Sequence, residues 1–169
     1  MAVPTHIEPN WTIRPFLPGD APAVRRLIES VWREHFHDHP DSFVRDFIYS
    51  RLSDIDNADA VYADRAAFLC AMAEDAIIGT GAIKRVDDRE CEVVRMFVAP
   101  NYRGHGIART IANGLISFAG SAGYERIRLS SNNALTASHR LYERMGFQRT
   151  ASWDPGSEAH SRHYALRIS

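Results

Sequence analysis

The sequence predicts an α/β (α+β) fold, with a mixed, mostly antiparallel central sheet of about six to seven strands flanked by about four helices. Two apolar segments, 67–72 and 77–86, are joined by a short polar turn, which is typical of antiparallel neighbours. A valine-rich segment, 91–99, follows another polar turn and leads through glycines into a helical pattern. The sequence therefore predicts an antiparallel meander followed by one strand–helix–strand crossover.

Length and composition indicate one globular domain over residues 1–169. The chain has 169 residues, 24% of them charged, and a formal net charge of −1. Lys84 is the only lysine and the arginines are scattered, so no basic stripe suggests a nucleic-acid partner. The first residues lack a signal-peptide pattern, and no apolar run is long enough to span a bilayer. We therefore expect a cytoplasmic protein without nucleic-acid or membrane partners, with buried free thiols at Cys70 and Cys91.

The first part of the chain is expected to form a short strand and two helices before the meander begins. The strand covers 11–14 and ends at prolines. Asp20 is a candidate cap for the first helix, and Asp41 or Ser42 for the second. Residues 53–65 are predicted to form an acidic loop. The apolar positions at helical spacing are Val24, Leu27, Ile28, Val31, Val44, Phe47, Ile48 and Leu52.

The second part of the chain is expected to complete the crossover and close the sheet. Apolar residues at helical spacing follow the glycines, and Gly120 to Gly123 ends this helix. Asn132 or Asn133 is a candidate cap for the last helix. Strands are expected over 126–130, 147–153 and 163–168.

The glycine turn between the third apolar segment and its helix has the composition of an anion site. The first amides of a helix lack intrahelical partners and carry partial positive charge. Glycines at 104 and 106 remove side chains that would keep a phosphate from the backbone, and Arg103 and Arg109 add charge. The sequence has no P-loop pattern and no full dinucleotide-binding glycine pattern. A pyrophosphate cradle and a tight turn needed only for backbone reasons both remain open.

Two motifs extend this interpretation. Val98-Ala99-Pro100 precedes Arg103-Gly104-His105-Gly106-Ile107-Ala108, and Leu141-Tyr142-Glu143-Arg144-Met145-Gly146-Phe147 follows downstream. The first resembles the central Arg/Gln-x-x-Gly-x-Gly/Ala motif of the GNAT family of acyl-CoA N-acyltransferases, after a strand that ends in Val-x-Pro. The second is similar to that family's Leu-Tyr-x-x-x-Gly-Phe. The resemblance covers roughly residues 77–147 and implies a GNAT-like sheet.

The resemblance implies an N-acetyltransferase that moves an acetyl group from acetyl-CoA to a primary amine of a small molecule or a protein. The amine attacks directly, without a covalent enzyme intermediate, and no metal takes part. A backbone N–H near Phe97 would bind the oxyanion. Many family members are dimers, so a homodimer is one expected assembly. The implied cofactor-binding residues are Met96, Phe97, Val98, Arg103, Gly104, His105, Gly106, Ile107, Ala108 and Asn133.

Two side chains are candidates for proton transfer. Tyr142 stands where many family members keep a tyrosine facing the coenzyme sulfur, and a phenol can donate a proton to a leaving thiolate. A core aromatic on an apolar helix face is the alternative. Glu92 matches the position of a catalytic glutamate in some members and would act as general base. Pairing with Arg95, or another surface role, is its alternative.

A histidine-rich segment precedes the second predicted helix and supplies rival bases. His35, His37 and His39 alternate around Asp38, and Glu34 lies beside them. A metal site, a loop lining the acceptor pocket and a solvated loop are the three interpretations. Alternate side chains splay apart in extended backbone and no other ligand cluster is evident, so we expect no metal. The resemblance places the acceptor beside this segment.

Two functions other than acetyl transfer remain open. One is a catalytically silent acyl-CoA-binding module that senses or regulates. The other is a phosphate site for a different ligand, such as a nucleotide, which competition by ATP but not by CoA would indicate. The identity of the amine acceptor does not follow from the sequence, because fold does not fix substrate.

Overall fold

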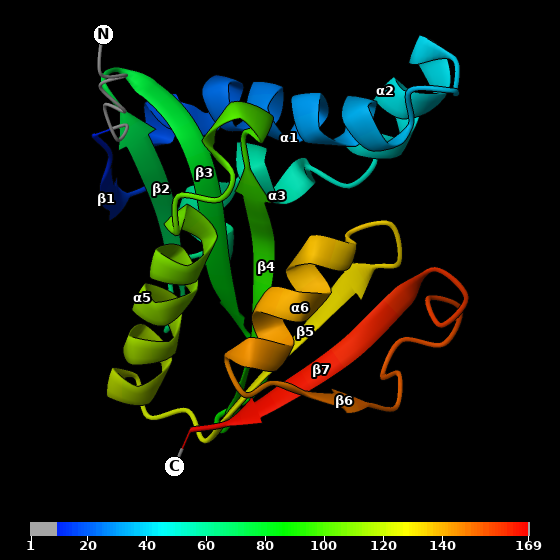
Figure 1. Cartoon of the computed structure of the whole chain (residues 1–169). Helices are drawn as coiled ribbons and strands as arrows, with labels where there is room; N and C mark the ends of the chain where they lie inside the picture. Colours follow the sequence, from blue (N-terminus) through cyan, green and yellow to red (C-terminus); the bar gives the residue numbers. More distant parts are fainter. Residues whose placement is uncertain (1–9, 169) are drawn as a thin grey trace, which may run out of the picture.

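The computed structural model describes residues 10–168, which contain a seven-stranded sheet in the order β1-β2-β3-β4-β5-β7-β6 (Figure 1). The strands are β1 Thr12–Pro15, β2 Ala67–Ala73, β3 Ala76–Arg85, β4 Glu90–Val98, β5 Arg126–Asn132, β6 Gln148–Thr150 and β7 Ser161–Arg167. The helices are α1 Ala21–His35, α2 Asp41–Tyr49, α3 Ser53–Asp56, α4 Ala58–Val61, α5 Ile107–Ser121 and α6 Thr136–Arg144, with 3₁₀ turns η1 Pro18–Asp20 and η2 Pro100–Tyr102.

The pairing of the strands confirms the predicted mixed, mostly antiparallel sheet. Strands β4 and β5 run parallel, and every other neighbouring pair in the described sheet is antiparallel. Helix α5 is the crossover between the parallel strands, because a tight turn cannot join them. Strands β2, β3 and β4 form the predicted meander.

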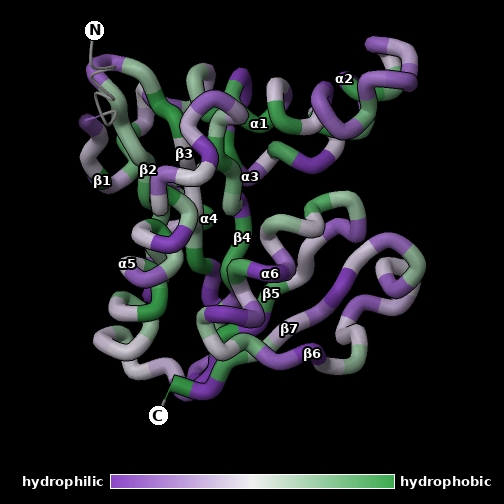
Figure 2. Tube along the Cα trace, viewed as in Figure 1, coloured by the Kyte–Doolittle hydropathy of each residue, from purple (hydrophilic) through white to green (hydrophobic). Residues whose placement is uncertain are grey.

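Helices cover both faces of the sheet and divide the core in two. On one side α5 packs on β2, β3 and β4, and α6 lies beside it over the second half of the sheet (Figure 1). On the other side α1 packs on β3 and β4, and α2 packs on α1. Figure 2 shows hydrophobic residues along β3 and β4 and hydrophilic ones along β6, so the core lies around the central strands.

The predicted helix periodicity is confirmed in α1, where Val24, Leu27, Ile28 and Val31 are buried. Asp20 occupies the cap position of α1, as predicted, but its side chain makes no cap hydrogen bond to the helix. Its carboxylate accepts from the Leu17 amide and from the Arg14 guanidinium, so it closes the 3₁₀ turn η1 instead.

The other two cap predictions were wrong. The residue before α2 is Pro40, and Asp41 is the first residue of the helix itself. The cap position of α6 is Leu135, with no side-chain cap hydrogen bond. Asn132 ends β5, and its side chain accepts from the Ala134 amide, so it closes the turn between strand and helix.

The acidic loop predicted over 53–65 contains two single-turn helices, α3 and α4. Leu52, Ile55 and Ala58 are buried, and this spacing of three places them on one side of the helical turns. The acidic residue Asp54 is also buried, with 7% of its surface exposed. The acidic composition of this segment predicted a loop, because no residue nearby in the sequence indicates a partner that would allow the Asp54 carboxylate to be buried.

The strand predicted over 147–153 is only β6, which ends at Thr150. Beyond it the hydroxyls of Ser152 and Ser157 lie 3.1 and 3.0 Å from Nε2 of buried His163. This contact folds the segment 151–160 back on β7 instead of continuing the hairpin.

Both thiols are free and buried, as predicted, with Cys70 in the core under α1 and Cys91 in the core under α5. Burial raises the pKa of each to about 12, so neither is a nucleophile at neutral pH. Within residues 10–168 no helix is long and apolar enough to cross a membrane. The expectation about a signal peptide depends mainly on residues 1–9, which lie outside the described part.

Candidate active site

The parallel strands β4 and β5 separate before they end. Their pairing stops at Val93 and Leu129, although β4 continues to Val98. On its other edge β4 stays paired with β3 as far as Val98 and Gly79. The last residues of β4 therefore have a free backbone edge toward β5, and such an edge can pair with an extended ligand.

A β-bulge lies where the strands separate. Ala82 of β3 pairs with Val94, while Thr80 pairs with Phe97, so two residues of β4 lie opposite Gly81 alone. The first of them, Arg95, has a left-handed backbone with φ of 58°. The Thr80 hydroxyl donates to its carbonyl at 2.8 Å. Bulges bend strands, which agrees with the separation of β4 from β5 at this point.

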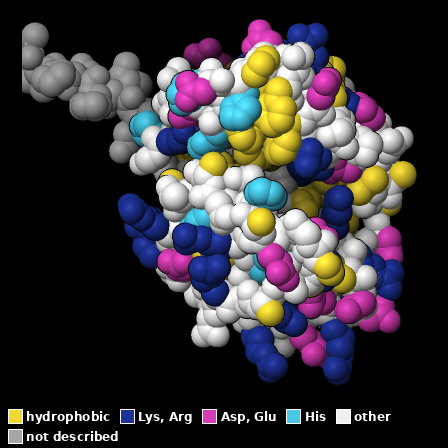
Figure 3. Space-filling model, turned by 90° about the vertical axis from the view of Figure 1, so that its right-hand side faces the viewer, with side chains coloured by type: hydrophobic (Ala, Val, Ile, Leu, Met, Phe, Trp, Pro, Cys, Tyr) yellow, Lys and Arg dark blue, Asp and Glu magenta, His cyan; other side chains and the backbone are white. Residues whose placement is uncertain are grey.

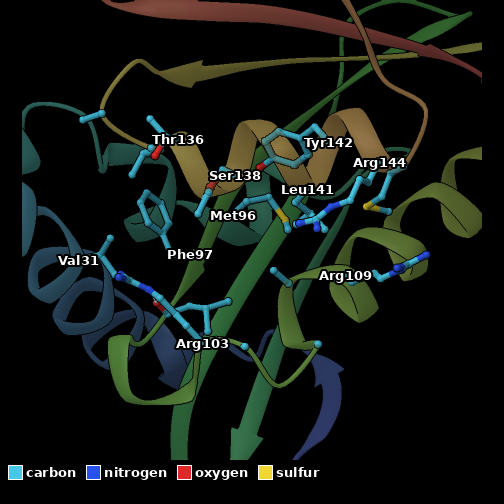
Figure 4. A pocket seen from close by; sticks show the side chains of 18 of the residues that line it. Val31, Met96, Phe97, Arg103, Arg109, Thr136, Ser138, Leu141, Tyr142 and Arg144 are labelled. Carbon is cyan, nitrogen blue, oxygen red and sulfur yellow. Dashed lines mark hydrogen bonds between the residues drawn. The ribbon is translucent and has the colours of Figure 1, made fainter.

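A cavity of about 480 Å³ lies between the end of β4, the glycine turn and the helices α1, α5 and α6 (Figure 4). Met96, Phe97 and Val98 form its β4 wall. Gly104, Gly106 and Ala108 line it from the glycine turn and the start of α5. The remaining lining residues are Val31, His35, Arg103, Arg109, Ala134, Leu135, Thr136, Ala137, Ser138, Leu141, Tyr142, Arg144 and Met145.

The glycine turn presents free amides to this cavity. Gly104 and Gly106 have φ of 80° and 79°, and a Cβ on either would meet nothing within 4 Å. Glycine is therefore required here by the left-handed backbone and not by crowding within the chain. Among residues 10–168, the amides from Gly104 to Arg109 have no hydrogen-bond acceptor. A run of free amides at the N-terminus of a long helix is suited to bind phosphate.

Three arginines line the cavity. Arg103 forms a two-oxygen ion pair with Glu34, at 2.9 Å for each contact, which ties the turn to the end of α1. Arg109 and Arg144 line the cavity from α5 and α6, and neither has a salt bridge within the described residues (Figure 4). These two guanidinium groups are therefore available to an anion without breaking an existing ion pair.

Tyr142 projects from α6 into the cavity, with its hydroxyl turned toward Met96 (Figure 4). Only 5% of the residue is exposed, and its ring lies edge-on to Phe147 at 5.8 Å. Its hydroxyl has no hydrogen-bond partner in the described chain. Burial raises the pKa of this phenol well above its usual value, so it keeps its proton at neutral pH.

Glu92 lies outside the cavity lining. Its carboxylate accepts from Arg128 of β5 at 3.1 Å, at the end of β4 that is still paired. The suggested partner Arg95 pairs instead with Asp54, at 2.7 and 2.9 Å. Of the two main candidates for proton transfer, Tyr142 and Glu92, the structure therefore brings only Tyr142 to the cavity.

The histidine-rich segment divides between cavity and surface. His35 is in the last turn of α1 and lines the cavity, whereas His37 and His39 do not. Burial lowers the pKa of His35, and the charge of Arg103 lowers it further against the opposing effect of Glu34. Histidine and hydrophobic side chains gather in the upper half of the face in Figure 3. Within residues 10–168 no group of three or more His, Cys, Asp or Glu is arranged to hold a metal.

Three predicted cofactor residues do not line the cavity with their side chains. His105 is exposed and lies 3.2 Å from the Tyr102 carbonyl, and Ile107 is buried in the core. Their free backbone amides remain part of the turn. Asn133 is exposed, and its side chain donates to the Ala159 carbonyl at 3.2 Å, so it braces the segment before β7.

The sequence reasoning missed most of the α6 wall. Ala134, Ser138, Leu141 and Met145 recur at spacings of four and three and all line the cavity. That periodicity was the available signal, but the same spacing is expected for a helix face that packs in the core. Arg144 gave no signal, because a lone arginine near a helix end is common on protein surfaces.

The bulged β4, its open edge, the glycine turn and the buried phenol line one cavity, and their geometry suits an extended, phosphate-bearing ligand. A sequence model of the Acetyltransferase (GNAT) family matches residues 24–147, which is more than half of the chain. The chain belongs to that family.

Relatives and solved structures agree with this assignment. An N-acetylaspartate synthetase from Danio rerio is 34% identical over 85 residues, which are 50% of this chain and 30% of that protein. An N-acetyltransferase from Mycobacterium bovis, described as uncharacterized, is 28% identical over 62% of this chain and 67% of its own length.

The fold is also shared with solved structures. A GNAT-family acetyltransferase from Staphylococcus aureus superposes with a TM-score of 0.81 at 20% identity, covering 95% of this chain and 100% of that one. The PaiA N-acetyltransferase of Thermoplasma acidophilum, solved with coenzyme A, gives 0.79 at 16% identity over 94% and 99%. At these identities the likeness establishes the fold alone.

Proposed function

We propose that this protein transfers an acetyl group from acetyl-CoA to a primary amine by direct attack. The observation that carries the proposal is the free edge of β4 beside a turn whose amides, from Gly104 to Arg109, have no acceptor within the described chain. Coenzyme A offers the complement to both, because its pyrophosphate is an anion and its pantetheine arm carries amides that pair like a strand.

The anchoring of the coenzyme follows from these two features. The amides of the glycine turn hold the pyrophosphate, and Arg109 and Arg144 contribute charge from both sides of the cavity. The backbone of Met96 to Val98 holds the pantetheine arm along the open edge. The thioester then lies near Phe97 and Tyr142, which line the same cavity.

The chemistry at the thioester needs an oxyanion donor and a proton for the leaving thiolate. A backbone N–H near Phe97 takes the first role, because donors that are already fixed in place are effective when charge develops. The neutral Tyr142 phenol takes the second, since its hydroxyl has no partner in the described chain to compete for its proton.

The general base has two candidates. Glu92 holds the role by resemblance, while His35 lines the cavity. A base must reach the amine directly or through one water, and Glu92 is held by Arg128 away from the cavity. The lowered pKa of His35 keeps its imidazole neutral near pH 7, which suits proton uptake.

The acceptor is an amine of a small molecule or a protein. The name of the Danio rerio relative adds aspartate to the amines worth testing. We also propose a homodimer as one assembly of this chain, which sedimentation of the purified protein would test.

The first experiment is a calorimetric titration with acetyl-CoA and CoA, with ATP as the control anion. We expect micromolar binding of both coenzyme forms, equivalent to about 8 kcal/mol, and no binding of ATP. Thiol release with a panel of amines then tests transfer. Binding without release on a broad panel would favour the silent acyl-CoA sensor, and no coenzyme binding by folded protein would refute the site.

A further inference from the structure

A buried polar cluster lies behind the cavity wall, between α3 and β4. The Asp54 carboxylate accepts from Arg95 at 2.9 and 2.7 Å and from the Tyr62 hydroxyl at 2.6 Å. The Lys84 ammonium lies 3.9 Å away. Only 8% of the Asp54 side chain and 20% of the Arg95 side chain are exposed. A buried charge pair with this many bonds is held in one geometry.

The arginine of this cluster is also the strained residue of the β4 bulge. Its φ of 58° is a left-handed conformation that non-glycine residues rarely adopt. The same guanidinium donates to the Arg51 carbonyl, so it ties the α2–α3 connection to β4. Strain of this kind persists only where surrounding contacts fix it. Here the contacts are the Asp54 carboxylate, the Arg51 carbonyl and the Thr80 hydroxyl.

The bulge decides which way the next residues face. Met96 is the second residue of the bulge and is followed by Phe97 and Val98, and these three residues form the β4 wall of the cavity. Without the extra residue opposite Gly81, the register of β4 against β3 would shift by one position. A shift of one residue turns each side chain to the other face of a sheet and changes the direction of its amide.

We propose that Asp54 and Arg95 are positioning residues, whose ion pair holds the bulge in β4 and thereby aims the Met96–Val98 backbone at the pantetheine arm. The inference rests on the proposed coenzyme site. Neither side chain lines the cavity, so both act through the backbone of β4. The ion pair should not affect the glycine turn, because the conformation of that turn depends on its own glycines.

The test compares Arg95→Ala with Arg95→Gly. Both variants lose the guanidinium and leave Asp54 without it, so the effects of the missing charge are common to both. They differ in backbone freedom, because glycine adopts a positive φ without strain and alanine does not. Calorimetry would measure two ligands, CoA and 3′-phospho-ADP, the latter being the coenzyme without its pantetheine arm.

The expected result separates the two halves of the coenzyme. Arg95→Ala should bind CoA at least tenfold more weakly than wild type, with 3′-phospho-ADP within threefold. Arg95→Gly should bind both ligands within threefold of wild type. Equal losses in the two variants, or CoA binding by Arg95→Ala at the wild-type level, would overturn the inference.

Two further variants keep the inference testable if Arg95→Ala fails to fold. Asp54→Asn removes the charge that holds Arg95 and should weaken CoA while sparing 3′-phospho-ADP. Tyr62→Phe removes one bond to the same carboxylate but leaves the ion pair, so it should lower the unfolding temperature without changing either affinity. Equal CoA affinities for Asp54→Asn and Tyr62→Phe would count against the ion pair.

Crystal structures of Arg95→Gly and Asp54→Asn separate this inference from the proposed function. We expect the two residues opposite Gly81 to persist in the glycine variant and to be lost in Asp54→Asn. If wild type binds neither ligand, the coenzyme site is wrong. An unchanged bulge in Asp54→Asn would overturn the positioning role whatever the ligand results.

Discussion

Two segments of the cavity wall use a left-handed backbone, and they achieve it in different ways. In the turn before α5, Gly104 and Gly106 adopt φ of 80° and 79° with nothing within 4 Å of a Cβ at either position. In β4, Arg95 adopts φ of 58° and is held by a buried carboxylate. The first conformation is intrinsic to the residue type, whereas the second depends on α3 being folded in place.

Because of this difference, we expect the two ends of the coenzyme site to respond to different substitutions. The glycine turn should lose its conformation only when a side chain is introduced into it. Every ligand that carries the phosphates of the coenzyme should then bind more weakly. The bulge at Arg95 should be lost when its distant partner Asp54 is changed. Only binding of the pantetheine arm, which lies along β4, should then weaken. The predictions below test this division from the largest expected effect to the smallest.

Gly106→Asp should abolish coenzyme binding, with a loss of at least about 1,000-fold, equivalent to about 4 kcal/mol. The substitution adds a negative charge to the proposed phosphate site and forces a β-carbon onto a backbone with φ of 79°. Titration with CoA and 3′-phospho-ADP measures it, and both affinities should fall together. Wild-type affinity in this variant would refute the phosphate site.

Gly106→Ala and Gly120→Ala form the matched control for that substitution. Neither added methyl group meets an atom of the chain within 4 Å, but Gly120 lies within α5 and has no positive φ. The first change should destabilise the protein by about 1–2 kcal/mol through strain. The second should stabilise it by roughly 0.5–1 kcal/mol, because alanine favours a helix. Urea unfolding distinguishes them.

Tyr142→Phe should lower turnover by about 100-fold while CoA affinity stays within threefold. The substitution removes the unpartnered hydroxyl and keeps the ring that packs on Phe147. Tyr164→Phe is the control, because it removes a hydroxyl from the same core that is bonded to Glu143 and lies outside the cavity lining. Thiol-release kinetics measure both, and unchanged turnover in Tyr142→Phe would remove it from the mechanism.

The sequence predicted the parts of this site whose conformation is local. The glycines of the turn and the Leu-Tyr of α6 lie within short motifs, and the periodicity of α1 predicted its buried face. The bulge was not predicted, because Arg95 and Asp54 are 41 positions apart and neither has a neighbour that marks the contact. The prediction of the length of β6 was wrong for a similar reason, because the two serines that contact His163 lie in a different segment of the sequence.

His35→Asn should lower kcat/KM by about tenfold, and more than Glu92→Gln does, if the base is the residue that lines the cavity. The His35 pKa is lowered by burial from 6.5, so its protonation should reduce wild-type activity only below that value. The acid limb of the pH profile should therefore disappear in His35→Asn and remain in Glu92→Gln. An acid limb that remains in His35→Asn and disappears in Glu92→Gln would instead identify Glu92 as the general base.

Asp54→Asn should flatten the acid dependence of stability. Burial opposes ionisation of Asp54, but its bonds to Arg95 and Tyr62 outweigh that effect and hold its pKa below the usual 3.8. A lowered folded pKa means that the carboxylate stabilises the fold fully above the unfolded pKa, and that this stability is lost as the pH falls through the folded pKa. Urea unfolding free energies at pH 5 and pH 3 should therefore differ more in wild type than in Asp54→Asn. Because Gly106→Ala leaves the ion pair between Asp54 and Arg95 intact, it should keep the wild-type dependence of stability on pH. A flattened profile in that variant would show that the two left-handed segments are not independent.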